Sequence, residues 1–174
     1  MPIIKKKVCL VGAAGVGKTS LIKRFVHSVF GEKYLSTIGV DISKKTVCLD
    51  DREVMMVIWD TAGEEALYHV PTSYFSGNEG TILVVDGTRP DTLSTGLKIR
   101  ERAARAGDKS QWICLLNKFD LVASWAVDAS TESELAKMNM PTFRTSAKTG
   151  TNVDVAFHEM AHKVSNECVT SSMG

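Results

Sequence analysis

The stretch Gly12-Ala13-Ala14-Gly15-Val16-Gly17-Lys18-Thr19 decides the fold, because it matches the phosphate-binding pattern G-x-x-x-x-G-K-S/T without a gap. An apolar run at 8–11 precedes it, and apolar residues at helical spacing follow it between Leu21 and Val26. A strand, a glycine loop and a helix in this order let successive N–H groups and the positive end of the helix converge on one anion. The stretch therefore predicts an α/β fold that binds a nucleoside triphosphate.

Residue roles in this loop follow from its chemistry. Lys18 is expected to reach the outer phosphates, and the Thr19 hydroxyl is expected to ligate Mg²⁺. The alternative is a glycine-rich turn without a ligand, which the strand before the loop and the helix after it disfavour. The predicted phosphate-binding residues are Gly12, Ala13, Ala14, Gly15, Val16, Gly17, Lys18, Thr19 and Ser20.

Length and composition limit the class of protein. The 174 residues correspond to a single domain over 1–174, and 44% apolar with 24% charged residues is typical of a globular protein with a full core. A net charge of +1 argues against a nucleic-acid partner. No apolar run approaches the roughly 18 residues of a membrane span. The four cysteines, at 9, 48, 114 and 168, lack paired metal spacing, which fits a reduced compartment. We expect a cytoplasmic monomer.

Alternating strand and helix patterns extend along the whole chain. Asp50-Asp51-Arg52 looks like a hairpin turn, which places one antiparallel strand at the edge of the sheet. The prediction is a three-layer fold of the P-loop type, with a six-stranded, mostly parallel sheet and helices on both faces. Strands are predicted at 3–11, 40–49, 53–59, 80–86, 111–116 and 141–145, and helices begin near Lys18, Asp91, Thr131 and Asn152, the last three as N-caps.

Two more motifs lie where ligands bind in such sheets, beyond the carboxyl ends of strands. Asp60 ends an apolar strand and is followed by a small-residue loop with Gly63. Its carboxylate is expected to hold Mg²⁺ through water, and the Gly63 N–H is expected to approach the terminal phosphate. The alternative for Asp60 is an ordinary polar strand end.

The other motif predicts which base is bound. Asn117-Lys118-Phe119-Asp120 follows the strand that begins near Trp112. The Asp120 carboxylate can accept two hydrogen bonds from guanine N1 and N2, whereas adenine offers no such pair of donors. A site built on that pair discriminates by roughly 10⁴. Ser146-Ala147-Lys148 ends the last strand, and the Ala147 N–H is expected to bind guanine O6.

With these motifs in this order, the chain resembles a small GTPase of the Ras superfamily from about Val8 to the final helix. Such proteins hydrolyse GTP with Mg²⁺ and act as switches, so the resemblance implies GTP, GDP and Mg²⁺ as ligands. It also implies that Thr37 ligates Mg²⁺ and the γ-phosphate, that Phe30 stacks on guanine and that Tyr34 lies over the phosphates. Without the resemblance, Phe30 would be interpreted as a core aromatic.

Within the superfamily, the segments 36–42 and 73–77 are similar to the Rab branch. The resemblance implies that switch segments at about 30–42 and 60–76 are recognised by effectors, exchange factors and activating proteins. It also places a partner-facing surface on Ile42, Trp59 and Tyr74, where the Rab pattern has three aromatic residues. Isoleucine at 42 departs from that pattern, which puts the usual Rab effectors in doubt.

Glu64 stands where the family has the glutamine that orients the attacking water. We therefore assign catalysis to Glu64, Lys18 and Gly63. A carboxylate can accept a hydrogen bond from water but cannot donate one to the transferring phosphoryl group, and it adds negative charge beside it. The resemblance thus leaves two alternatives, a slow GTP hydrolase that cycles or an interaction module that stays loaded with GTP.

Two further features bear on partners. The chain ends in Ser172-Met173-Gly174 with no C-a-a-X box, and Pro2 excludes N-myristoylation, so either the tail is truncated or the protein carries no lipid anchor. His158-Glu159-Met160-Ala161-His162 matches the zinc motif H-E-x-x-H. The apolar stripe of that helix must face the sheet, which leaves both histidines toward solvent, so we expect no zinc and no metalloprotease activity.

Overall fold

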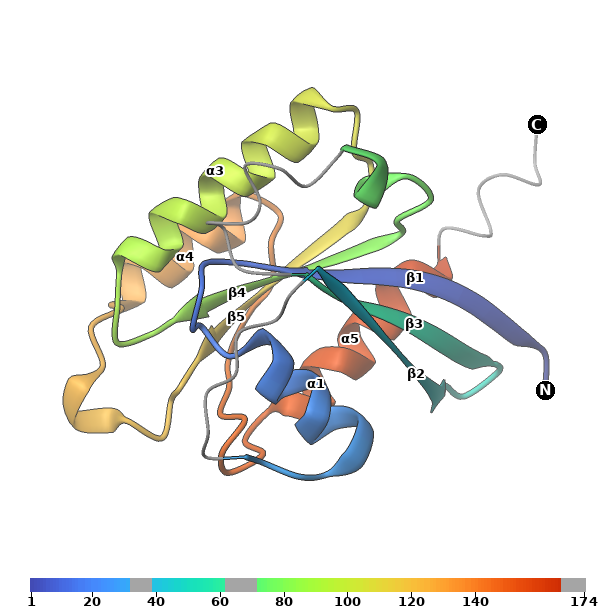
Figure 1. Cartoon of the computed structure of the whole chain (residues 1–174), viewed down its shortest axis with the longest axis horizontal. Coiled ribbons are helices and arrows are strands. Elements are labelled where there is room, and N and C mark those ends of the chain that lie inside the picture. The colour runs from blue at the N-terminus through green and yellow to red at the C-terminus, as the bar shows by residue number, and fades with distance from the viewer. Residues whose placement is uncertain (32–38, 62–71, 167–174) are drawn as a thin grey trace.

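A six-stranded sheet with strand order β2-β3-β1-β4-β5-β6 organises the molecule. The computed structural model describes residues 1–31, 39–61 and 72–166 (Figure 1). The strands are β1 (Ile3–Val11), β2 (Val40–Cys48), β3 (Glu53–Thr61), β4 (Gly80–Asp86), β5 (Gln111–Asn117) and β6 (Thr142–Arg144). The helices are α1 (Lys18–His27), α3 (Asp91–Arg105), α4 (Ala129–Lys137) and α5 (Val153–Asn166), with 3-10 turns η1 (Thr72–Phe75) and η2 (Val122–Ser124).

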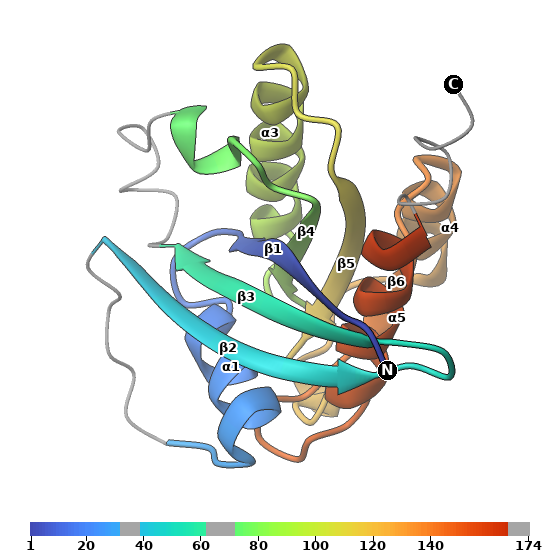
Figure 2. The same ribbon diagram turned by 90° about the vertical axis from the view of Figure 1, so that its right-hand side faces the viewer.

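The predicted mixture of parallel and antiparallel pairing is confirmed. Strand β1 pairs in parallel with β3 and β4, and β5 pairs in parallel with β4 and β6. Strand β2 pairs antiparallel with β3 at the edge of the sheet (Figure 2). The predicted hairpin turn joins these two strands, and the Leu49 N–H donates to the Arg52 carbonyl over 2.8 Å.

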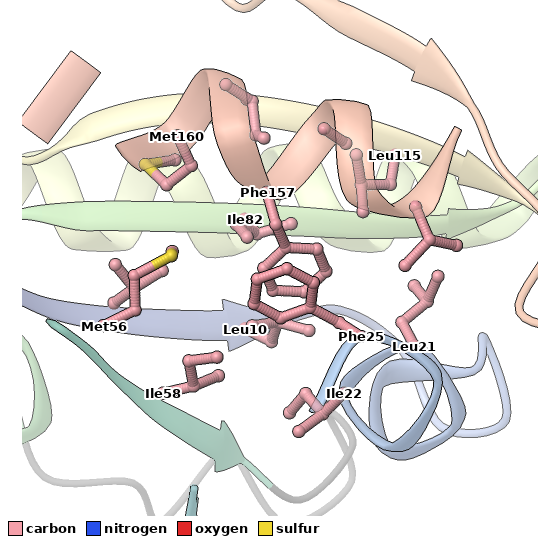
Figure 3. Close-up of a cluster of buried hydrophobic side chains, with 14 of the residues drawn as sticks. Leu10, Leu21, Ile22, Phe25, Met56, Ile58, Ile82, Leu115, Phe157 and Met160 are labelled. Atoms are coloured by element: carbon pink, nitrogen blue, oxygen red, sulfur yellow. The ribbon is translucent and has the colours of Figure 1, made fainter. Parts of the chain in front are cut away.

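Helices cover both faces of the sheet, so the fold has the predicted three layers. Helices α1 and α5 pack on one face, where the rings of Phe25 and Phe157 stack with centroids 4.1 Å apart (Figure 3). Helices α3 and α4 pack on the other face through Ile99 and Leu135 (Figure 1). Strands β4 and β5 lie between both helix layers, which is why their sequences are continuous apolar runs.

Two of the predicted N-caps are wrong. Helix α4 begins at Ala129, and its cap is Asp128, whose carboxylate accepts from the Thr131 N–H over 2.9 Å. The negative carboxylate lies at the positive end of the helix, where it is the better acceptor. Asp91 is the first residue of α3 and follows Pro90 at the cap position. Asn152 does precede α5, but its side chain donates to the Arg144 carbonyl.

The histidine motif lies on α5 as the apolar stripe predicts. His158 and His162 are exposed. The stripe residues Val153, Ala156, Phe157, Met160, Ala161 and Val164 are buried. Within residues 1–31, 39–61 and 72–166, no three metal-binding side chains come together. In the same part of the chain, no helix is both long enough and apolar enough to span a bilayer.

Candidate nucleotide-binding site

The glycine loop connects β1 to α1 at the carboxyl end of the sheet, and it holds Lys18 in a buried position. Lys18 is 6% exposed, and its Nζ donates to the carbonyls of Gly12 and Ala13 over 3.0 and 2.9 Å. Gly17 caps α1 with a φ of 103°, in the left-handed region that favours glycine. The loop thus presents an ammonium group and a helix N-terminus to one point, the arrangement that binds phosphate.

Two oxygen ligands suited to a divalent cation lie beside this ammonium group. Thr19 Oγ1 donates to Asp60 Oδ2 over 2.5 Å, and Asp60 is 3% exposed. Hydroxyl and carboxylate oxygens are the donors that Mg²⁺ prefers, so the pair fits that ion. When bound, Mg²⁺ neutralises negative charge on the phosphates. Thr37, the third predicted ligand, lies outside the described residues.

A cavity of about 370 Å³ opens next to the glycine loop and collects most of the predicted base-binding residues. Asp120 lies in its wall, and Ser146 donates to Asp120 Oδ1 over 2.6 Å. Phe30 is half-buried, lines the cavity and packs against the core beneath it. The lining residues are Gly15, Gly17, Ser20, Phe30, Gly31, Asn117, Lys118, Asp120, Leu121, Ala147 and Lys148.

Asn117 connects the glycine loop to the loop after β6. It is 2% exposed, and its Nδ2 donates to the Val16 carbonyl over 2.9 Å. Its Oδ1 accepts from Thr145 Oγ1 over 3.2 Å and from the Ala147 N–H over 3.3 Å. The Ala147 N–H that we expect at guanine O6 therefore makes a long hydrogen bond to Asn117, while Asn117 fixes the spacing of two loops.

Some predicted site residues fall outside the described part of the chain. These are Tyr34 and Thr37 in the first switch segment, and Gly63 and Glu64 in the second. Their roles remain predictions from the resemblance.

The structure adds Arg24, which sequence reasoning missed. Its guanidinium donates to the carbonyls of Ala147, at 2.7 Å, and of Lys148. Two hydrogen bonds from one planar group fix both position and orientation. Arg24 therefore ties α1 to the loop predicted to bind guanine O6.

One comparison with known proteins covers this whole site. The model of the Ras family matches residues 7–166 of the chain. The chain belongs to the Ras family. Ras-family proteins are small GTPases that bind guanine nucleotides and Mg²⁺, hydrolyse GTP and act as switches. The matched range includes the glycine loop, Asp60, Asp120 and Ser146, so the family's ligands and the site described above agree in chemistry.

The buried ammonium group of this Ras-family site predicts a pH dependence of nucleotide binding. Burial lowers the pKa of Lys18 to about 8, against the opposing charge of Asp60. Bound phosphate favours the charged form and raises that pKa again, so above about pH 8 binding takes up a proton. We expect the affinity for GDP to be constant below about pH 8 and to fall by up to about tenfold per pH unit above it.

Equilibrium titration of GDP at several pH values measures this effect. The control is Lys18→Arg, because a guanidinium stays charged over this range. Binding by that variant is expected to be weaker but to lose the decline above about pH 8. An affinity of the wild type that stays constant to about pH 9.5 would contradict the assignment to Lys18.

Proposed function

We propose that this Ras-family chain is a Rab-like switch, whose segments at about 30–42 and 60–76 are recognised by effectors, exchange factors and activating proteins in a nucleotide-dependent way. We also propose a cytoplasmic monomer. The three free cysteines among the described residues, Cys9, Cys48 and Cys114, support a reduced compartment.

One observation carries the proposal: the three predicted partner-facing side chains adjoin one another next to Asp60. Ile42 is 47% exposed and pairs across the β2–β3 ladder with Trp59. The rings of Trp59 and Tyr74 meet edge to face with centroids 5.9 Å apart. An exposed aliphatic side chain beside two half-buried aromatic rings is the kind of anchor surface that protein partners bind.

Lys7, on β1, contacts this surface and stabilises it. Its Nζ lies 3.9 Å from the centroid of the Trp59 ring and donates to the carbonyls of Tyr74 and Ser76 over 2.6 and 3.0 Å. The cation therefore connects the end of β3 to the last residues of the second switch segment. A shift of the Asp60 backbone would be transmitted directly to this partner-facing surface, because Trp59 is its neighbour in the chain.

The switch is expected to turn over slowly on its own. Hydrolysis without an arginine finger supplied by a partner is slow, because such a finger is typically worth 10³ to 10⁵ in rate. The alternative is a GTP-loaded interaction module with impaired hydrolysis. Only the identity of residue 64 favours that alternative.

Single-turnover hydrolysis followed by two signals tests the proposal. Protein loaded with GTP and mixed with Mg²⁺ is expected to release phosphate slowly, while tryptophan fluorescence changes at the same rate because Trp59 adjoins Asp60. In Trp59→Phe, phosphate release should continue and the fluorescence change should disappear. The other two indoles have different partners from the Trp59–Tyr74 pair, because Trp112 donates to Asp108 and the Trp125 ring packs edge to face on Phe119.

The other possible results of this experiment either contradict the proposal or favour its alternative. A fluorescence change that survives in Trp59→Phe would contradict a nucleotide-sensitive surface at this position. GTP that stays bound without turnover would favour the loaded module. Glu64→Gln is expected to respond differently from the wild type to a glutamine-dependent activating protein, and identical stimulated rates would remove the role given to Glu64.

A further inference from the structure

Asp86 is a buried carboxylate at the end of β4, and it is not one of the site residues predicted from the sequence. It is 1% exposed, and its position in the ladder pairs it with Asn117 at the end of β5. Its Oδ1 accepts from the N–H and the hydroxyl of Thr88 over 2.9 and 2.7 Å. Its Oδ2 accepts from two cations, Lys118 and Arg89.

The first cation belongs to the base-binding side of the site. Lys118 Nζ lies 2.7 Å from Asp86 Oδ2, and the Lys118 side chain lines the cavity. Its backbone has a φ of 68°, in the left-handed region that residues other than glycine rarely adopt. The ion pair to Asp86 helps to hold that conformation, and Asp120 follows two residues later in the same loop.

The second cation belongs to the phosphate side. Arg89 Nε lies 3.1 Å from Asp86 Oδ2, and its Nη2 donates to the Ala14 carbonyl over 3.1 Å. Ala14 is in the glycine loop, next to the Ala13 carbonyl that binds Lys18. The contact therefore joins β4 to the phosphate-binding loop, which is 75 residues away in the sequence.

We propose that Asp86 is a positioning residue for nucleotide binding, which couples the guanine-binding loop to the phosphate-binding loop through Lys118 and Arg89. Asp86 is not among the residues that line the cavity, so it acts on the nucleotide through its two cations. It fixes two loops relative to each other, because both cations share one carboxylate oxygen that the sheet holds in place. A buried charge with two partners is rigid, since any movement of the carboxylate leaves a cation unpaired.

The electrostatics of the residue agree with this role. Burial alone would raise the pKa of Asp86, but hydrogen bonds from Lys118, Thr88 and Arg89 outweigh that effect and hold the pKa below its ordinary value. The group is therefore a carboxylate at neutral pH.

Asp86→Asn tests the proposal, because it keeps the shape of the side chain and removes its charge. We expect the affinity for GDP to fall by about tenfold to 100-fold, the scale of a charge-assisted hydrogen bond. We also expect a smaller preference for GDP over inosine diphosphate, which lacks the amino group predicted to bind Asp120. The control is Asp91→Asn, an exposed carboxylate at the start of α3, which should leave both quantities unchanged.

Arg89→Met separates the two sides and guards against failure of the first variant to fold, because the Arg89 side chain is 44% exposed. It should weaken GDP and inosine diphosphate equally, since only the phosphate side is released. In the double variant, the effects should be less than additive. Folded Asp86→Asn with unchanged affinity and preference, or Arg89→Met that binds like the wild type, would overturn the proposal. The test requires GDP binding alone and is independent of hydrolysis and of any protein partner.

Discussion

Asp120→Asn is expected to lower the affinity for GDP by about 10²-fold to 10⁴-fold and to create affinity for xanthosine diphosphate. The carboxylate is predicted to accept from N1 and N2 of guanine, and each hydrogen bond to a charged group is worth about 1.5–3 kcal/mol. In the variant, the amide NH₂ group would face the N2 amino group of guanine, so two hydrogen-bond donors would oppose each other. Xanthine carries a carbonyl oxygen where guanine carries that amino group, so the same amide nitrogen would find an acceptor.

Ser146 determines which way the new amide turns. Its hydroxyl donates to Asp120 Oδ1 over 2.6 Å and accepts from the Thr149 N–H over 3.1 Å, so its proton is directed at residue 120. The amide oxygen of the variant should take the Oδ1 position, which directs the nitrogen into the cavity. Competition titrations with GDP, xanthosine diphosphate and ADP measure the outcome. Unchanged GDP affinity with no gain for xanthosine diphosphate would show that Asp120 does not bind the base.

The parts of the site that the sequence predicts well are those that depend on neighbouring residues. The glycine loop is recognisable because a strand, three glycines, Lys18 and a helix follow one another within about twenty residues. Asp60 and Asp120 are recognisable because each follows an apolar strand, and parallel strands bring their carboxyl ends to one edge of the sheet. The hairpin and the burial of β4 and β5 on both faces are also predictable, because each depends only on residues that are neighbours in the sequence.

The contacts that fix the loops relative to one another could not be predicted in this way. Arg24 binds the carbonyl of Ala147, which is 123 residues away in the sequence. In the sequence alone, nothing distinguishes Arg24 from any other basic residue near the end of a helix. Asp86 ends an apolar strand as Asp60 does, so its position was a usable signal, but its pairing with Arg89 and Lys118 depends on how three loops pack. The N-cap of α4 could not be predicted for a similar reason. Asp128 and Thr131 are both residue types that cap helices, and only the geometry of the helix start selects Asp128.

Gly12→Ala is expected to destabilise the fold more than any other single methyl added to the glycine loop. A Cβ at this position would lie 2.3 Å from the Val84 carbonyl oxygen and 3.2 Å from a methyl group of Val16. The oxygen belongs to the backbone of β4, which is held between β1 and β5 and buried throughout, so it cannot move aside. The glycine also has a φ of 152°, where a side chain adds strain.

Overpacking typically costs about 1–3 kcal/mol and backbone strain about 1–3 kcal/mol. Together they remove a large share of the roughly 5–15 kcal/mol that stabilises a typical domain. Urea unfolding of nucleotide-free protein measures the loss without a contribution from bound ligand. Gly31→Ala is the matched control, because a Cβ there meets nothing within 4 Å, and its effect should stay within about 0.5 kcal/mol. Equal unfolding midpoints for the two variants would mean that β1 and β4 are not held as tightly at Gly12 as the register of the sheet requires.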